Sequence, residues 1–514
     1  MTDTRASRRR FLLGGATVLG GVLLAACGAA ATPTPAPAKP AEAPKPTEAP
    51  KPAAAPTQAP AAAAPTNTPA AAAAAKPTEA AKPAAEATKP TEAPKPTTAP
   101  AAAAPAAAGT AGTVVVWAGS LAATDMATPG GQWAKWVRDT FKEKNPKFEV
   151  KAESHGWDQE LRTGLLTAIA GGVVPEITTG EAFVHEFAAL GAFLPVPDLT
   201  PKYFAYGPVA GSIYKGQLYG VPIFTSPFGL ETNKRTAEKA GLDPTKAPKT
   251  WDELVANSEK AKQAGGTNFV GFNLYGPAPN RIYGAVLRTI PWINQTGKPL
   301  GDDDGTQAFF NAPEHVAAYE LSRKLFKTGD PGNTFSGDEG KLYGYLWQDK
   351  AVYQASATWN AYNALDAKAE SIFHPLPRKD ANVSGNVVLG NEVYSPLAKA
   401  KNRDGAIALV KFMAEPETQR QVGKVLGSRL PTTAEVLKDP ELEKLPAYAK
   451  VSAQMRVFAD ILLTEDVRPV PPYAKNADKI WIAWGDAFGK ILQSSDPIKP
   501  ILDQLQQDVE KLLK

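Results

Sequence analysis

Hydrophobic residues beyond position 112 alternate between two spacings. Thr113–Trp117 is a β-branched run that ends in tryptophan, a pattern typical of a buried strand. The apolar residues that follow are spaced as on one face of a helix: Trp133, Trp136, Val137 and Phe141. Because strand and helix patterns go on alternating at this interval, we predict an α/β fold with a parallel sheet.

The same two patterns recur along the rest of the chain. One predicted helix starts with a capping box, Thr250 to Glu253, in which each side chain should accept a hydrogen bond from the other residue's amide. The further predicted elements are strands over Phe148–Ala152, Glu176–Thr179 and Ala351–Ala355, and helices over Leu161–Ile169, Thr250–Ala264, Ala406–Ala414 and Leu502–Leu512.

Residues 1–27 have the layout of a bacterial export signal. Arg8–Arg10 precede Phe11–Ala26, an apolar stretch with the length of a signal core and too short for a typical membrane span. Ser7–Leu12 resembles the twin-arginine motif, which directs folded proteins across the membrane. We therefore expect a twin-arginine signal peptide.

Leu24–Cys27 resembles a bacterial lipobox, in which the cysteine is acylated and becomes the new N-terminus. Cys27 is the only cysteine of the chain, so no internal disulfide can form. The alternative is an ordinary apolar residue within the signal. The prediction is an extracytoplasmic protein that acylated Cys27 anchors to the cell membrane.

Residues 28–110 consist almost entirely of Ala, Pro, Thr, Lys and Glu, with the unit KPTEAPKP repeated. Without large apolar residues, nothing can offset the entropy of ordering this segment, so we predict a disordered tether. It would hold the folded domain off the membrane, across cell-wall material where that is present. The alternative is a proline-rich recognition peptide, but the repeats carry no aromatic anchor.

Residues 111–514 are too many for one compact core, which predicts two lobes. The net charge of +4 is small and no basic run lies beside aromatic residues, so no nucleic-acid partner is expected. A phosphate-binding loop and a nucleophile elbow are both absent from the sequence. The four histidines lack the spacing of a zinc site, and Asp302–Gly305 fails the calcium-loop pattern and is interpreted as an exposed turn. We expect no metal and no cofactor.

Several short stretches occur in an order found in one family. These stretches are Val115–Trp117, Phe141–Pro146, Leu165–Gly172, Leu190–Leu194, Gly216–Pro222, Ala240–Leu242, Thr250–Leu254, Phe373–Pro377 and Ala406–Met413. By them the chain resembles the extracellular solute-binding proteins of ABC importers, in the group that includes maltose-binding and other sugar-binding receptors. It departs from that group at Glu176, Thr232 and Asp349–Tyr353, which weakens any transfer of ligand identity.

The resemblance implies a two-lobed α/β fold of the periplasmic-binding-protein kind (type II), with three crossings and a ligand cleft between the lobes. Lobe 1 should comprise about residues 111–222 and 378–430, and lobe 2 about 223–377 and 431–514. Closure would be a hinge motion. The expected crossings are Val221–Phe224, His374–Pro377 and Ser428–Thr432.

The resemblance also suggests which residues contact the ligand. Most of them follow a predicted strand, where an aromatic ring could stack on a sugar and polar neighbours could bind its hydroxyls. For each the alternative is ordinary packing, or for Glu181 a solvated loop carboxylate. The candidate ligand-binding residues are Trp359, Asn360, Glu181, Phe183, Trp292, Tyr275, Asn391, Trp157 and Ser120.

Three functions remain open at this point. The first is a monomeric receptor that captures a carbohydrate and delivers it to the membrane permease of an ABC importer, without catalysis. The second is the same receptor for another solute, such as a polyamine, a phosphate ester or a peptide. The third is a secreted glycosidase, which would need two facing carboxylates in the cleft.

Overall fold

The structure, a computed structural model of the chain, describes residues 112–514 except 181–182, 201, 203, 205, 280–281, 381–382, 384–388, 428, 445–450 and 465. The chain divides into two units, Met1–Ala99 and Pro100–Lys514, and every described residue belongs to the second. The predicted signal peptide, Cys27 and the predicted tether therefore lie outside the described residues.

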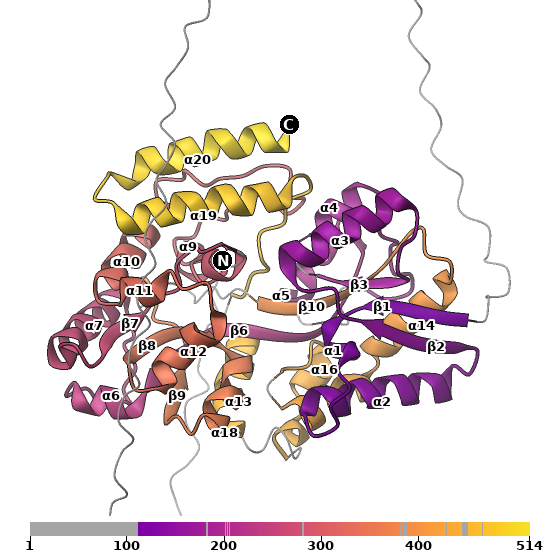
Figure 1. The fold of residues 1–514 in the computed structure, drawn as a ribbon, viewed down its shortest axis with the longest axis horizontal. Coiled ribbons are helices and arrows are strands. Elements are labelled where there is room, and N and C mark those ends of the chain that lie inside the picture. Colours follow the sequence, from indigo (N-terminus) through magenta and orange to yellow (C-terminus); the bar gives the residue numbers. More distant parts are fainter. Residues whose placement is uncertain are drawn as a thin grey trace, which may run out of the picture. The chain divides into compact units, whose positions relative to one another are not determined.

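Lobe 1 is built on three parallel strands (Figure 1). β1 (Gly112–Trp117) pairs with β2 (Phe148–Glu153) on one side and with β3 (Ile177–Thr179) on the other. The valines of β1 are buried or half-buried, as its β-branched run predicts. β10 (Leu389–Pro396) then pairs with β3 in the antiparallel sense.

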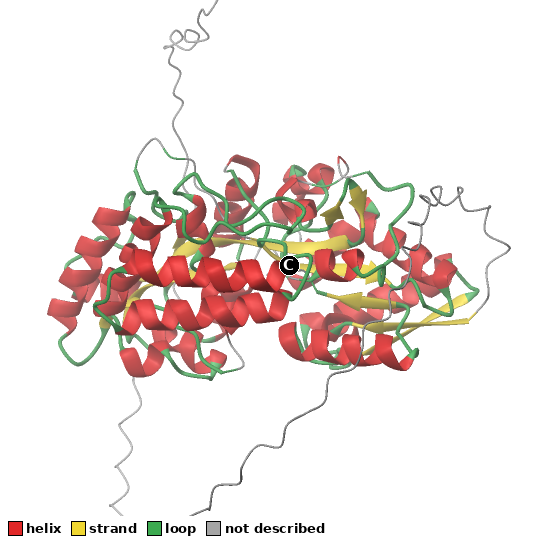
Figure 2. Ribbon diagram, turned by 90° about the horizontal axis from the view of Figure 1, so that it is seen from above, coloured by secondary structure: helices red, strands yellow, loops and turns green. Residues whose placement is uncertain are grey.

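Helices and a small hairpin complete lobe 1. They are α1 (Gly119–Ala122), α2 (Pro129–Lys144), α3 (Asp158–Gly171), α4 (Val184–Ala189), α5 (Tyr206–Ala210), the hairpin β4 (Ile213–Tyr214) and β5 (Gln217–Leu218), α14 (Arg403–Ala414), α15 (Pro416–Gln421) and η2 (Val422–Leu426). Figure 2 shows helices on both sides of the strands, the arrangement that buries both faces of a sheet.

Lobe 2 continues the sheet. β6 (Val221–Asn233) pairs with β8 (Ala351–Ala357) and β9 (Ser371–His374), both antiparallel, and β7 (Val270–Asn273) pairs with β8 in parallel. Its helices are α6 (Lys234–Lys239), α7 (Trp251–Gly265), α8 (Ile282–Leu287), α9 (Ile290–Asn294), α10 (His315–Lys327), α11 (Pro331–Thr334), α12 (Glu339–Trp347), α13 (Thr358–Asp366), α18 (Ser452–Thr464), α19 (Ala477–Gln493) and α20 (Ile498–Leu513). α16 (Ala434–Leu437) packs instead against α15 of lobe 1, and η3 (Pro440–Lys444) follows it along the chain.

β6 belongs to both lobes. Its first part, up to Pro227, pairs with β10, and its second part, from Phe228, pairs with β8 and β9. The pairing therefore changes three residues beyond the predicted crossing at Val221–Phe224. All of β6 is buried and extended, so its sequence carries no break at the change of partner. The third predicted crossing meets the same strand, because Leu430 forms a bridge to Thr225.

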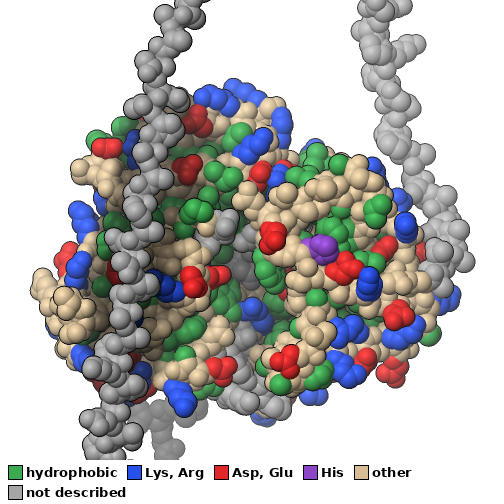
Figure 3. All heavy atoms as spheres, viewed as in Figure 1, with side chains coloured by type: hydrophobic (Ala, Val, Ile, Leu, Met, Phe, Trp, Pro, Cys, Tyr) green, Lys and Arg blue, Asp and Glu red, His purple; other side chains and the backbone are tan. Residues whose placement is uncertain are grey.

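Two clusters of buried apolar side chains fill the fold. The smaller one lies in lobe 1 and contains Trp133 and Phe141, both fully buried. The larger one is built mostly from lobe 2 and also includes Leu165 and Phe187 of lobe 1. Apolar packing therefore runs from one lobe into the other. On the face shown in Figure 3, acidic and basic side chains are interspersed.

The predicted α/β class is confirmed, but the sheet is mixed and not purely parallel, since β6 and β10 run against their neighbours. One half of the predicted capping box forms, with the Thr250 hydroxyl accepting from the amide of Glu253 at 3.2 Å. The other half of the predicted capping box, a hydrogen bond from the Thr250 amide to Glu253, is wrong. The Glu253 carboxylate accepts at 2.6 Å from the amide of Lys249, one residue earlier.

Candidate functional site

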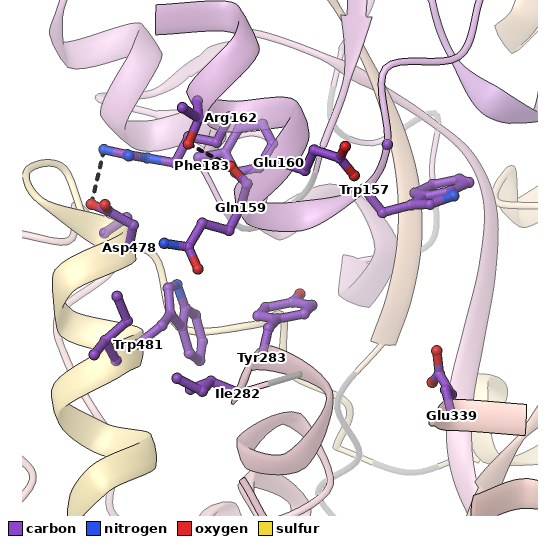
Figure 4. Close-up of a pocket in the computed structure, with 14 residues that line it drawn as sticks. Trp157, Gln159, Glu160, Arg162, Phe183, Ile282, Tyr283, Glu339, Asp478 and Trp481 are labelled. Atoms are coloured by element: carbon purple, nitrogen blue, oxygen red, sulfur yellow. Dashed lines mark hydrogen bonds and ion pairs between the residues drawn. The ribbon is translucent and has the colours of Figure 1, made fainter. Parts of the chain in front are cut away.

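A cavity of about 800 Å³ lies between the two lobes. The start of α3 and the segment after β3 form its lobe-1 wall, and α8, α12 and α19 form its lobe-2 wall (Figure 4). Segments that follow strand ends gather at such a crevice in α/β folds. The lining residues are Gly156, Trp157, Gln159, Glu160, Arg162, Thr163, Phe183, Ile282, Tyr283, Glu339, Ala477, Asp478, Trp481 and Ile482.

Two predicted aromatic residues stand on the lobe-1 wall. Trp157 precedes α3 and is 56% exposed, and its ring lies over Gly119, where a Cβ atom would come within 3.3 Å of it. Phe183 follows β3 and packs over Gly180, which has a φ of +142° and where a Cβ atom would come within 2.2 Å of the ring. Glycine at both positions lets an aromatic ring lie close to the backbone.

The lobe-2 wall combines aromatic rings with carboxylates. Tyr283 from α8 and Trp481 from α19 meet edge to face, with ring centroids 5.1 Å apart. Glu339, at the start of α12, and Asp478, in the first turn of α19, add the acidic groups. The cavity therefore offers apolar faces beside hydrogen-bond acceptors.

Glu339 also connects the cavity to a group of aromatic and charged side chains near the crossing segments, which we name the hinge cluster. Lobe 1, the crossings and lobe 2 all contribute to it, so the cluster joins the two lobes. Its members are Ser120, Tyr275, Arg288, Tyr343, Trp359, Glu392 and Arg429.

Arg288 is held between two tyrosines. Its guanidinium carbon lies 4.0 Å from the ring centroid of Tyr275 and 5.3 Å from that of Tyr343, within the range of cation–π attraction. Arg288 donates a hydrogen bond to the Tyr343 hydroxyl, which in turn donates to Glu339 at 2.6 Å. Burial raises the pKa of Tyr343 to about 12, so this hydroxyl stays protonated at neutral pH.

Arg429 lies beside the predicted cleft tryptophan. Its guanidinium carbon is 5.6 Å from the Trp359 ring and 5.2 Å from the Phe224 ring. The Trp359 indole N–H donates to the Tyr343 hydroxyl at 3.1 Å. Burial lowers the pKa of the Arg429 guanidinium, and the nearby carboxylate of Glu392 opposes that shift.

Glu392 is a buried carboxyl group on strand β10, 3% exposed. The Ser120 hydroxyl donates to its Oε1 at 2.7 Å. Burial raises the pKa of Glu392 to about 7, although Ser120 and the Arg429 charge lower it. Among the described residues, Oε2 of Glu392 and Nη1 of Arg429 have no hydrogen-bond partner. Native proteins rarely leave buried polar atoms unpaired, so these two atoms are exceptions within the cluster.

Five of the predicted ligand residues lie in the cavity wall or in the hinge cluster. Trp157 and Phe183 line the cavity, and Ser120, Tyr275 and Trp359 belong to the hinge cluster. None of these positions tests ligand contact directly.

Two other candidates are enclosed. Trp292 is 2% exposed and meets Trp251 edge to face, and Asn360 is fully buried and donates to the Ser356 hydroxyl at 2.8 Å. Their burial favours the packing role that the sequence left open. Glu181 lies outside the described residues. Asn391, in β10, pairs with Thr225 of β6, but the side chain of Asn391 is not described.

Sequence reasoning missed four residues of the hinge cluster: Arg288, Tyr343, Glu392 and Arg429. Arg429 carried a usable signal, because a lone arginine falls within the predicted crossing Ser428–Thr432. Glu392 carried another, as the one carboxylate within an otherwise uncharged strand. Arg288 and Tyr343 are helical residues whose pairing depends on tertiary packing.

Neither a membrane helix nor a metal site is found in the part of the chain that the structure describes. No helix there is long and apolar enough to cross a membrane. Nor do three or more His, Cys, Asp or Glu side chains gather there in a group that could hold a metal ion.

Comparison with known proteins gives consistent matches. Residues 123–420 match the family described as bacterial extracellular solute-binding protein. A probable amino-acid ABC transporter periplasmic-binding protein of Sinorhizobium fredii is 25% identical over 304 residues, which are 58% of this chain and 65% of the relative. The sn-glycerol-3-phosphate-binding periplasmic protein UgpB of Salmonella paratyphi A is 26% identical over 314 residues, which are 57% of this chain and 70% of the relative.

Among solved structures, the cyclic alpha-maltosyl-1,6-maltose binding protein of Arthrobacter globiformis superposes with a TM-score of 0.65. The match covers 78% of this chain and 99% of that protein, at 21% sequence identity. At this identity the likeness shows the two-lobed fold alone.

Proposed function

Because the chain belongs to the family of bacterial extracellular solute-binding proteins, we propose that it captures a carbohydrate between its lobes and hands it unaltered to an ABC importer. The observation that carries this proposal is the interlobe cavity of about 800 Å³, in which aromatic rings stand beside carboxylates and amides. Its size is within the range of small-molecule sites.

The cavity chemistry suits a sugar. The rings of Trp157, Tyr283 and Trp481 can cover the C–H faces of a pyranose. Gln159 and Glu339 stand on opposite walls and can accept hydrogen bonds from its hydroxyls. A neutral solute rich in hydroxyls satisfies both kinds of group.

A phosphate ester is the second candidate, because two arginines belong to the hinge cluster and one relative binds sn-glycerol 3-phosphate. Arginine forks recognise phosphate well. However, Glu392 stands close to Arg429, and Glu339 lies 4.0 Å from Arg288. These carboxylates reduce the attraction for an anion, so we favour the neutral carbohydrate.

Titration calorimetry of the full-length protein distinguishes the two candidates. Maltotriose and related oligosaccharides should bind, and Trp157→Ala should raise their Kd roughly tenfold by removing a stacking face. Phe309→Ala, an exposed aromatic residue outside the cavity, is the control and should leave the Kd unchanged. Binding of sn-glycerol 3-phosphate alone, abolished by Arg429→Gln, would favour the phosphate ester instead.

The same proposal covers location and partners. Family membership implies an extracytoplasmic protein, and the Leu24–Cys27 lipobox supports a lipid anchor. We propose a monomer that meets an importer permease at the membrane and has no catalytic activity. Cys27→Ala should release the protein from membranes and abolish incorporation of labelled fatty acid. Hydrolysis of the bound sugar by the purified protein would overturn the non-catalytic proposal.

A further inference from the structure

A buried ion triad bridges the two lobes at the cavity wall. On lobe 1, Arg162 of α3 donates from Nε and Nη2 to both carboxylate oxygens of Glu186, at 2.8 and 2.6 Å. Nη2 of Arg162 also lies 3.1 Å from Oδ1 of Asp478, on helix α19 of lobe 2. Figure 4 shows this contact on the opposite side of the cavity from Trp157.

The triad is better shielded from water than the other charge contacts of the cavity. Side-chain exposure is 9% for Arg162, 6% for Glu186 and 20% for Asp478. Shielded pairs attract more strongly and are screened less by salt than exposed ones. Another polar contact between the lobes, from the Lys215 amide to Asp304 at 3.3 Å, is exposed.

The triad can also open without leaving a buried charge unpaired. If lobe 2 moves away, Arg162 keeps both hydrogen bonds to Glu186, which belongs to its own lobe. Asp478 then returns to water in the first turn of α19, where the helix dipole favours a negative charge. Breaking a buried ion pair is costly mainly when it strands one partner, and here neither is stranded.

We propose that the Arg162–Asp478 contact is a reversible closure latch, which sets the affinity of the receptor by favouring the closed lobes. This inference rests on the proposed receptor function. A solute that binds the closed state gains affinity in proportion to the closed fraction. Arg162 and Asp478 are therefore positioning residues.

Asp478→Asn tests the latch, with Asp486→Asn as the matched control. Asp486 is an exposed carboxylate on the same helix and contributes nothing to the triad. Spin labels would be placed at Lys147→Cys on lobe 1 and Lys246→Cys on lobe 2 of the full-length chain, with Cys27→Ser. Without any solute, Asp478→Asn should shift the label distance toward the open population, and Asp486→Asn should not.

In titrations, Asp478→Asn should raise the Kd for maltotriose roughly fivefold or more, mainly through faster dissociation. Unchanged label distances in Asp478→Asn would overturn the latch. Because the label distances are measured without solute, the latch can be tested even if no sugar binds. In that case the titrations that measure Kd use sn-glycerol 3-phosphate.

Discussion

At the residue scale, the hinge cluster places ionisable groups where burial governs their protonation. Glu392 is the clearest case, because its carboxyl group is nearly inaccessible and has one unpaired oxygen among the described residues. Protonation would turn this acceptor into a hydrogen-bond donor near neutral pH.

Stability should decline as the pH rises through the pKa of Glu392. Burial raises this pKa from an ordinary 4.5 to about 7, so the folded state binds the proton more tightly than the unfolded state. The protonated carboxyl stabilises the fold fully below pH 4.5 and loses that effect by about pH 7. Glu392→Gln should remove this slope, worth on the order of 3 kcal/mol in the free energy of unfolding.

Urea unfolding of both proteins between pH 4 and 8 measures this effect. The difference in free energy between Glu392→Gln and the parent protein should grow as the pH increases. Parallel pH profiles would show that Glu392 does not titrate in this range.

Trp292 should act in stability and not in solute recognition. It is 2% exposed and packs against Trp251, so Trp292→Ala would leave a cavity and lower the free energy of unfolding by about 3–5 kcal/mol. Trp157→Ala is the opposite control, since Trp157 is 56% exposed and its loss should affect affinity more than stability. If Trp292→Phe, which preserves folding, weakened maltotriose binding as strongly as Trp157→Ala, the packing role would be wrong.

At the scale of elements, strongly periodic segments could be predicted from the sequence and shared segments could not. The helical spacing from Trp133 to Phe141 appears as α2, and the β-branched run at Thr113–Trp117 appears as β1. The predicted crossing at Val221–Phe224 lies before the observed change of strand partner, because one buried strand belongs to both lobes and its sequence pattern does not change along its length.

The residues of the candidate site also differ in whether the sequence could predict them. Trp157, Phe183 and Trp359 could be proposed because each follows a strand, and ligand sites in such folds gather there. Arg288, Tyr343 and the Arg162–Asp478 contact join residues far apart in sequence. Spacing alone cannot predict such pairs, because they depend on how helices from different parts of the chain pack.

Helix α7 offers a test of the capping interpretation. Thr250→Ala removes the hydroxyl that accepts from the Glu253 amide, so it should lower the free energy of unfolding by about 1 kcal/mol. Thr250→Ser retains the acceptor and should restore most of that loss. Thermal or urea unfolding measures both variants, and equal stability of the two would contradict a capping role.

At the scale of the whole molecule, two lobes share one sheet and enclose a cavity. β6 passes from one lobe into the other, paired first with β10 and then with β8 and β9, so a relative motion of the lobes would be absorbed near the change of strand partner around Pro227. The cavity and the hinge cluster lie where such a motion would bring the two lobes together around a solute.

Capture by lobe closure is best tested by following the label distance between Lys147→Cys and Lys246→Cys during a maltotriose titration of the full-length chain. We predict that the longer-distance population disappears as sugar is added, with a midpoint equal to the calorimetric Kd, and that the sugar is recovered intact. Calorimetric binding with an unchanged distance distribution would contradict capture by lobe closure.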